Sequence, residues 1–158
     1  MSLDIRTFDP EADIEGLKRC FVDLQNHEHD FAPEAPTGAE LVDDYLPFMV
    51  DRVRESGGEI FVADLDDQLI GFATAIVIAR SEPDDIDPFH VELAELSVIA
   101  GGRGHGVGAL LISAVEAFAR ERCAPSLRIR VDARNSGARR LYDRLGFSEL
   151  RIKVEKRL

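Results

Sequence analysis

Hydrophobic residues are grouped along the chain in short runs rich in β-branched and aromatic residues, separated by stretches with helical spacing. Runs of the first kind predict strands, because such residues fit the pleated, half-buried surface of a sheet. Asp66 and Asp67 separate two of these runs and predict a hairpin turn. We expect strands at residues 5–7, 60–65, 69–79, 91–99 and 127–131, and one or two more within residues 147–156.

Four other stretches have the i, i+3, i+4, i+7 spacing of apolar residues that predicts an amphipathic helix. The first follows Asp9 and Pro10, a cap residue and a proline at the first helical position, and should run to about Glu28. The second follows Thr37, which begins a capping-box sequence. The remaining two helices are expected at residues 107–122 and 138–145.

The order of these elements is β-α-α-β-β-β-α-β-α-β. Strand 91–99, helix 107–122 and strand 127–131 form a strand–helix–strand unit, so these two strands should be parallel and joined by a right-handed crossover. The preceding hairpins should be antiparallel. The sequence therefore predicts a single α/β domain over residues 1–158, with a central mixed sheet of six to seven strands and helices on both faces.

Charge and composition exclude several classes of partner. The 158 residues carry a formal net charge of −11, whereas a nucleic-acid-binding domain normally presents a basic surface to phosphates. The acidic surface favours cationic small molecules or basic peptides. No apolar run reaches the roughly 18–20 residues that a membrane helix needs, and the first residues lack the apolar core of a signal peptide. Cys20 and Cys123 do not suggest a disulfide framework. We expect a cytoplasmic protein with no membrane partner.

A glycine-rich segment between strand 91–99 and helix 107–122 is the most informative part of the chain. It reads Arg103-Gly104-His105-Gly106-Val107-Gly108-Ala109. Glycines let a backbone turn sharply and approach a ligand closely. The first turn of the following helix has unpaired N–H groups and the positive end of the helix dipole. This combination predicts a cradle for a pyrophosphate.

Two well-known phosphate-binding loops fit this segment poorly. A P-loop needs Gly-Lys-Ser/Thr, which the segment lacks. An NAD-type dinucleotide-binding protein needs G-x-G-x-x-G/A, which Gly104, Gly106 and Ala109 satisfy, and Asp132 lies where a ribose-binding acid would be expected. That fold, however, has its fingerprint at the first strand of a large parallel sheet, and the 26 residues after Asp132 are too few to complete one. The dinucleotide reading stays as an alternative.

A third possibility accounts for more of the chain. The pattern Arg103-x-x-Gly106-x-Gly108 resembles the Q/R-x-x-G-x-G/A signature of GNAT superfamily N-acetyltransferases, and Leu96-Ser97-Val98 precedes it at the expected distance. Downstream, Asn135, Ala138 and the run Leu-Tyr-Asp-Arg-Leu-Gly-Phe at 141–147 resemble the family's N-x-x-A-x-x-L-Y-x-x-x-G-F segment. The element order is also similar to the family's over the whole length.

The resemblance implies acetyl-CoA as co-substrate, no metal, and direct transfer in a ternary complex. In the family, acetyl-CoA enters where two parallel strands separate. Its pantetheine would pair with the backbone around Leu96, Ser97 and Val98, and the N–H of Val98 would polarise the acetyl carbonyl. The residues implied to hold the pyrophosphate and adjoining parts of the cofactor are Arg103, Gly104, His105, Gly106, Val107, Gly108, Ala109 and Asn135.

Two side chains are the candidates for proton transfer. By the resemblance, Tyr142 is the general acid that protonates the departing thiolate. The acceptor amine also needs a base or a water chain. Glu92 and Glu95 lie on strand 91–99 and, being three residues apart, should point to opposite faces. Glu95 is preferred because it lies closer to Leu96, but the sequence leaves Glu92 and a water chain open.

The acceptor is expected to be a small amine, an amino acid or a peptide. In the family, the loop between the first two helices often shapes the acceptor site, which makes candidates of His27, His29, Phe31 and Tyr45. The spacing of His27 and His29 matches no common zinc motif. The resemblance also implies a homodimer. A CoA-binding regulatory module without catalysis is the non-enzymatic alternative.

Overall fold

Five strands form one mixed sheet in the computed structural model, which describes residues 1–79, 83, 84, 87 and 89–158. The spatial order of the strands is β1-β2-β3-β4-β5. Neighbouring strands are antiparallel except for the parallel pair β4 and β5. The strands are β1 (Leu3–Thr7), β2 (Glu59–Leu65), β3 (Gln68–Ala79), β4 (Phe89–Val98) and β5 (Leu127–Ile129).

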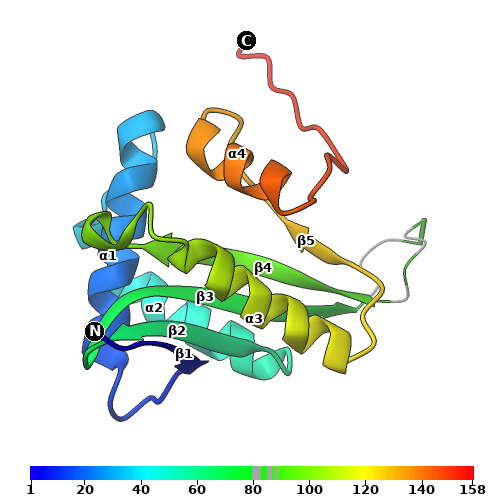
Figure 1. The fold of residues 1–158 in the computed structure, drawn as a ribbon. Helices are drawn as coiled ribbons and strands as arrows, with labels where there is room; N and C mark the ends of the chain where they lie inside the picture. The colour runs from blue at the N-terminus through cyan, green and yellow to red at the C-terminus, as the bar shows by residue number, and fades with distance from the viewer. Residues whose placement is uncertain (80–82, 85–86, 88) are drawn as a thin grey trace.

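Helices cover both faces of this sheet, as the sequence predicts (Figure 1). On one face, α1 and α2 enclose a core cluster that includes Leu17, Phe21, Met49 and Phe72. On the other face, α3 encloses a second cluster, and α4 lies beside β5 and the first turn of α3 (Figure 1). The helices are α1 (Ile14–Phe31), α2 (Gly38–Glu55), α3 (Val107–Glu121) and α4 (Ser136–Arg144).

Local sequence signals explain most of the boundaries. The Thr37 capping box at the start of α2 forms as predicted. The turn between β2 and β3 places Asp66 and Asp67 at φ values of 50° and 65°, which fits a tight hairpin. The first helix is the exception, since α1 begins at Ile14 rather than just after Pro10. The carboxylate of Asp13, the residue before it, accepts hydrogen bonds from Arg6 of β1 and from the N–H of Asp9.

A bulge interrupts the pairing of β4 with β3. Leu93 pairs with Ala75, but Leu96, three residues further along, pairs with Ala73, only two residues back. Both leucines nevertheless pack in the core beneath α3. The extra residue on β4 therefore reverses the alternation of side chains along this strand.

The bulge corrects the prediction that Glu92 and Glu95 point to opposite faces of the sheet. Glu95 contacts Tyr45 and Arg52 of α2. Glu92 lies next to Leu93, so alternation on the regular part of β4 also directs it away from α3. The prediction was wrong because it assumed an unbroken two-residue period.

The C-terminal strands expected at residues 147–156 are absent from this fully described segment, so the sheet has five strands rather than six or seven. The alternating residues Leu150, Ile152 and Val154 are 65%, 77% and 87% exposed. Alternation alone does not make a strand without a neighbour, and the segment leads away from the body rather than along β5 (Figure 1). β5 also ends at Ile129 instead of continuing to 131.

A bilayer-spanning helix is not found among the residues that the structure describes.

Candidate functional site

The parallel strands β4 and β5 diverge beside the glycine-rich loop (Figure 1). They pair at three positions, from Val91 with Leu127 to Leu93 with Ile129, and β4 then continues to Val98. The N–H of Ile99 donates to the carbonyl of Ile70 on the β3 side. Because bonded groups alternate along an antiparallel edge, the N–H of Val98 points to the opposite side, toward the opening. The predicted segment 96–98 therefore lines the opening between the two strands.

The glycine-rich loop adopts a conformation that its glycines make accessible. Gly104 and Gly106 both have φ of +79°, in the left-handed region, and a side chain at either position would meet nothing within 4 Å. Gly106 is the N-cap of α3, with no side-chain cap. Gly108 lies in the first turn, where an added Cβ would lie 3.4 Å from Leu141 of α4. The first turn of α3, with its N–H groups, therefore begins beside the open space at Gly104 and Gly106.

Arg103 connects this loop to its surroundings by hydrogen bonds. Its Nε donates to the carbonyl of Val98 at 2.7 Å, and its Nη2 lies 2.8 Å from a carboxylate oxygen of Asp23 on α1. Nδ1 of His105 lies 2.9 Å from the carbonyl oxygen of Arg103. The guanidinium thus ties the loop to the end of β4 and to α1.

α4 supplies Asn135 and Tyr142. The side chain of Asn135 caps the helix by accepting from the N–H of Ala138 at 3.1 Å. Tyr142 is buried, and its ring lies edge-to-face with Phe147 at 5.7 Å between centroids. Burial, and then the negative charge of Glu28, raise the pKa of Tyr142 to about 12. Its phenol is therefore protonated at neutral pH and able to donate.

Glu95 is held by three donors on the α1–α2 face of the sheet. Tyr45 donates from its hydroxyl at 2.7 Å, Arg52 donates from its guanidinium at 2.6 Å, and the hydroxyl of Thr74 also donates to it. Glu95 is only 8% exposed. Burial, and then the charge of Glu95, raise the pKa of Tyr45 to about 12. This carboxylate is thus firmly positioned, and its oxygens already accept several hydrogen bonds.

Glu92 has a simpler environment. Its carboxylate lies 2.9 Å from Arg130, which follows β5, and the arginine side chain is 83% exposed. The pair joins the two strands at the surface.

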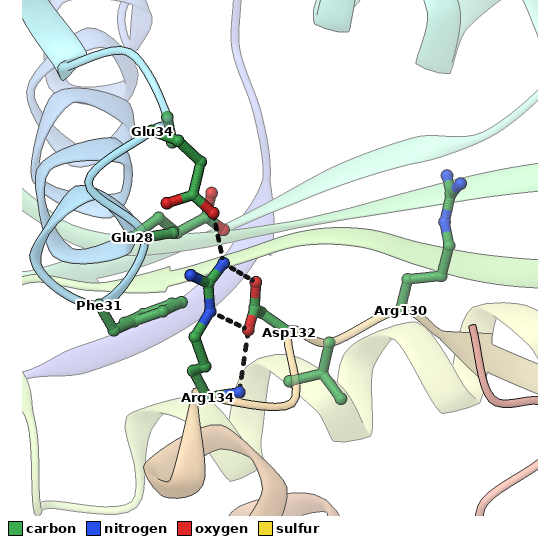
Figure 2. Close-up of a pocket in the computed structure, with 9 residues that line it drawn as sticks. Glu28, Phe31, Glu34, Arg130, Asp132 and Arg134 are labelled. Carbon is green, nitrogen blue, oxygen red and sulfur yellow. Dashed lines mark hydrogen bonds and ion pairs between the residues drawn. The ribbon is translucent and has the colours of Figure 1, made fainter. Parts of the chain in front are cut away.

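A cleft of about 440 Å³ lies between the end of α1 and the chain that follows β5 (Figure 2). Of the residues predicted to line an acceptor site, Phe31 does so. The other three candidates are not in its wall. His27 packs against Phe31, Nδ1 of His29 lies 2.7 Å from the carbonyl of Ala35, and Tyr45 faces Glu95. The lining residues are Glu28, Phe31, Ala32, Glu34, Ala35, Arg130, Val131, Asp132 and Arg134.

Arg134 joins the two walls of the cleft. Its guanidinium bonds Glu34 of the α1–α2 loop at 2.8 Å and Asp132 at 2.9 Å (Figure 2). Hydrogen bonds from the side chain and then the backbone N–H of Arg134 lower the pKa of Asp132 to about 2. Asp132, the candidate ribose-binding acid of the dinucleotide alternative, thus already forms an ion pair with Arg134.

Glu28 is the residue of this cleft that the sequence analysis missed. Burial, followed by the charges of Asp132 and Glu95, raises the pKa of its carboxyl group. A signal was present, because Leu17, Phe21 and Glu28 lie on one side of the predicted helix at spacings of four and seven residues. A glutamate in line with an inward-facing stripe is a candidate for a site at the end of the helix, and Glu28 lies there in the lining of the cleft with its side chain open to solvent.

Among the described residues, no group of three or more histidine, cysteine or acidic side chains is arranged to hold a metal ion.

Comparisons with known proteins bear on this arrangement. The profile of the Acetyltransferase (GNAT) family matches residues 21–147. A mycothiol acetyltransferase of Thermomonospora curvata is 29% identical over 150 residues, which are 95% of this chain and 46% of that protein. The chain thus spans about half the length of this curated relative.

Two solved structures have the same fold. An aminoglycoside N-acetyltransferase in complex with CoA has a TM-score of 0.75 and 20% identity, covering 99% of this chain and 95% of that one. A transcriptional regulator from Bacillus halodurans C-125 has a TM-score of 0.76 and 16% identity, covering 99% and 100%. These likenesses confirm the predicted α/β class.

Proposed function

Because the chain belongs to the GNAT family of acetyltransferases, we propose that it transfers the acetyl group of acetyl-CoA directly to a primary amine within a ternary complex. The observation that carries this proposal is the opening between β4 and β5, with an unpaired strand edge on one side and the first turn of α3 at its end. The acceptor is a small amine, an amino acid or a peptide.

Acetyl-CoA would occupy the opening between the strands. Its pantetheine would pair with the free edge of β4 at Leu96 and Val98, and its pyrophosphate would lie against the N–H groups at the start of α3. The positive φ at Gly104 and Gly106 and the open space beside them support this placement. The aminoglycoside acetyltransferase with the same fold binds CoA, which supports the choice of co-substrate.

The chemistry needs a polarised carbonyl, a neutral amine and a proton for the departing thiolate. The N–H of Val98 would donate to the acetyl oxygen. The amine nitrogen bonds to the acetyl carbon, the carbon–sulfur bond breaks, and the hydroxyl of Tyr142 protonates the thiolate. A phenol with a pKa of about 12 is a weak acid, so it would protonate the thiolate only when held close to it, and the exclusion of water would raise the basicity of the thiolate.

Glu95 is our sequence-based candidate for the base that neutralises the amine. Its hydrogen bonds from Arg52, Tyr45 and Thr74 also support a positioning role, in which it fixes the bulged part of β4 beside the thioester.

The alternatives have less support. An NAD-type protein would need Asp132 free for a ribose, whereas Arg134 forms an ion pair with it, and among the described strands only β4 and β5 are parallel. A regulatory module finds support in the fold it shares with the Bacillus halodurans transcriptional regulator. The buried, protonated phenol of Tyr142 favours catalysis.

A homodimer in the cytoplasm completes the proposal. Exposed Leu150, Ile152 and Val154 alternate along the C-terminal segment and would be covered by a second copy. The two cysteines are free, as in proteins of reducing compartments. Light scattering of the purified protein tests the dimer, and a monomer at micromolar concentration would contradict it.

Calorimetry with acetyl-CoA, CoA and NAD in parallel tests the co-substrate. We expect acetyl-CoA and CoA to bind and NAD not to bind. Binding of NAD alone would overturn the proposal and favour the dinucleotide alternative.

A further inference from the structure

We propose that Glu28 binds the ammonium group of the acceptor and takes the proton that this group must lose before it attacks acetyl-CoA. The inference rests on the proposed acetyltransferase function and adds to it the cationic class of the acceptor and the place where its nitrogen lies.

The position of Glu28 supports this role. It lies in the last turns of α1 and lines the cleft together with Phe31 of the same helix and Asp132 of the opposite wall. Figure 2 shows the side chains of Glu28 and Asp132 entering the same space from different elements. The charge of Glu28 also acts on the hydroxyl of Tyr142, so the carboxylate lies near the proposed general acid.

The surrounding carboxylates already have cations, and Glu28 does not. Arg134 bonds both Glu34 and Asp132, and separate arginines bond Glu92 and Glu95. Within the described part of the chain, no basic side chain or hydrogen-bond donor lies within bonding distance of the Glu28 carboxylate. Glu28 is exposed to solvent, but desolvation by its neighbours still raises the pKa of its carboxyl group, and an ammonium ion beside it would stabilise the ionised form.

The charged and titratable groups around Glu28 come from four parts of the fold. Arg130, Asp132 and Arg134 follow β5, Glu95 is on β4, Tyr142 is on α4, and Glu34 is in the α1–α2 loop. Asp132 and Glu95 add to burial in raising the pKa of Glu28. The raised pKa makes Glu28 a better proton acceptor than a solvated carboxylate.

The remaining wall of the cleft indicates the rest of the acceptor. Phe31, Ala32, Ala35 and Val131 supply the apolar part of the lining, the other five lining residues are charged, and a volume of about 440 Å³ suits a small molecule or the end of a peptide. The acceptor class is therefore a compact primary amine with both polar and apolar parts, whose ammonium group reaches Glu28.

The protons balance along this route. The ammonium group gives one proton to the Glu28 carboxylate and becomes a neutral amine, which attacks the acetyl carbon. The thiolate takes a proton from Tyr142, and the nitrogen, now bonded to the acetyl carbon, loses a second proton that restores the phenol. Glu28 releases the first proton to solvent, so each turnover yields the amide, CoA and one proton.

The test compares Glu28→Gln with a matched control, Asp30→Asn, which removes the same charge two residues away at an exposed position outside the cleft. Release of the CoA thiol is measured with 2-phenylethylamine, kanamycin and an alanyl dipeptide as acceptors. The measurements run from about pH 6 to about pH 9.

We expect Glu28→Gln to lower kcat/KM for the amine about tenfold or more at neutral pH and to lose the acidic limb of the pH profile. Its KM for acetyl-CoA should not change, and Asp30→Asn should match the wild type. Calorimetry with acetyl-CoA shows whether Glu28→Gln is folded.

Wild-type activity in Glu28→Gln would overturn this inference alone. If the wild type releases CoA with none of the acceptors, the proposed function fails first and the inference fails with it. A Glu28→Gln variant that loses both amine turnover and acetyl-CoA binding would show a structural role instead and would also overturn the inference.

Discussion

The guanidinium of Arg52 donates a 2.6 Å hydrogen bond to the carboxylate of Glu95 and so joins α2 to the bulged part of β4. The carboxylate is 8% exposed and the arginine side chain 29% exposed, so solvent screens this pair only in part. The bulge makes the contact possible, because it turns Glu95 toward α2. The contact fixes the strand that would hold the acetyl group.

Replacing Glu95 by glutamine should destabilise the protein. The amide keeps the size of the side chain but leaves the charge of Arg52 without its counter-ion, so the free energy of unfolding should fall by about 1–3 kcal/mol. Urea unfolding measures this loss. The matched control is Glu92→Gln, whose exposed partner Arg130 predicts a loss of no more than about 1 kcal/mol. Equal losses in the two variants would contradict the structural role of Glu95.

The same Glu95→Gln variant separates a base from a positioning residue. If Glu95 takes the proton of the amine, the acidic limb of the kcat/KM profile should disappear. If Glu95 positions β4 while another group takes the proton, activity should fall with the acidic limb unchanged. The position of Glu95 among three donors leads us to expect the second result.

Replacing Tyr142 by phenylalanine should slow turnover without weakening acetyl-CoA binding. The variant keeps the aromatic contact with Phe147 but removes the proton that the thiolate needs. General acid catalysis typically contributes about 10²–10⁴ in rate, so kcat should fall by at least about tenfold. Steady-state kinetics and calorimetry together measure both effects. Unchanged turnover would remove Tyr142 from the mechanism.

Substitutions of two glycines test the loop before α3. Gly106→Ala places a side chain at φ of +79°, which should cost about 1–2 kcal/mol of stability and weaken acetyl-CoA binding. Gly101→Ala is the matched control, because Gly101 has no positive φ and an added Cβ there meets nothing within 4 Å. Thermal unfolding and calorimetry report the two effects. If both variants bind acetyl-CoA like the wild type, the loop conformation does not matter for binding.

Stability should fall at strongly alkaline pH because of two tyrosines. Tyr45 and Tyr142 have pKa values of about 12 in the folded protein, above the value of about 10 for an unfolded chain. Below about pH 10 both states hold the phenolic protons, so this contribution to stability is fully present. Between about pH 10 and pH 12 the unfolded chain loses its protons first, so the free energy of unfolding decreases.

Urea titrations across this pH window should show that decrease in the wild type. A Tyr45→Phe, Tyr142→Phe double variant should show less of it. The same slope in both proteins would assign the alkaline loss to other groups.

The sequence was most informative where its signals are local. The glycines before α3, the capping box at Thr37 and the turn at Asp66 each depend on a few neighbouring residues, and the structure places all three as predicted. Val98 at the end of β4 and Tyr142 on α4 belong to motifs of the same kind, although the roles of both residues stay predictions.

Features set by contacts between distant segments could not be predicted. The bulge in β4 adds one residue without a change in composition, and it alone decides where Glu95 points. The C-terminal alternation indicated strands, but a strand needs a partner that the pattern does not specify. Glu28 gains its environment from Asp132 and Glu95, which lie far away in the chain.

Acetyl transfer underlies every role proposed for these residues, and following the acetyl group itself tests it. The protein is incubated with acetyl-CoA that carries a deuterated acetyl group and with a panel of primary amines, and the products are analysed by mass spectrometry. We predict at least one amide with the deuterated acetyl group, formed in equal amount to free CoA and much more slowly by Tyr142→Phe. Tight binding of acetyl-CoA with no labelled amide from any amine would contradict the claim and favour a regulatory module.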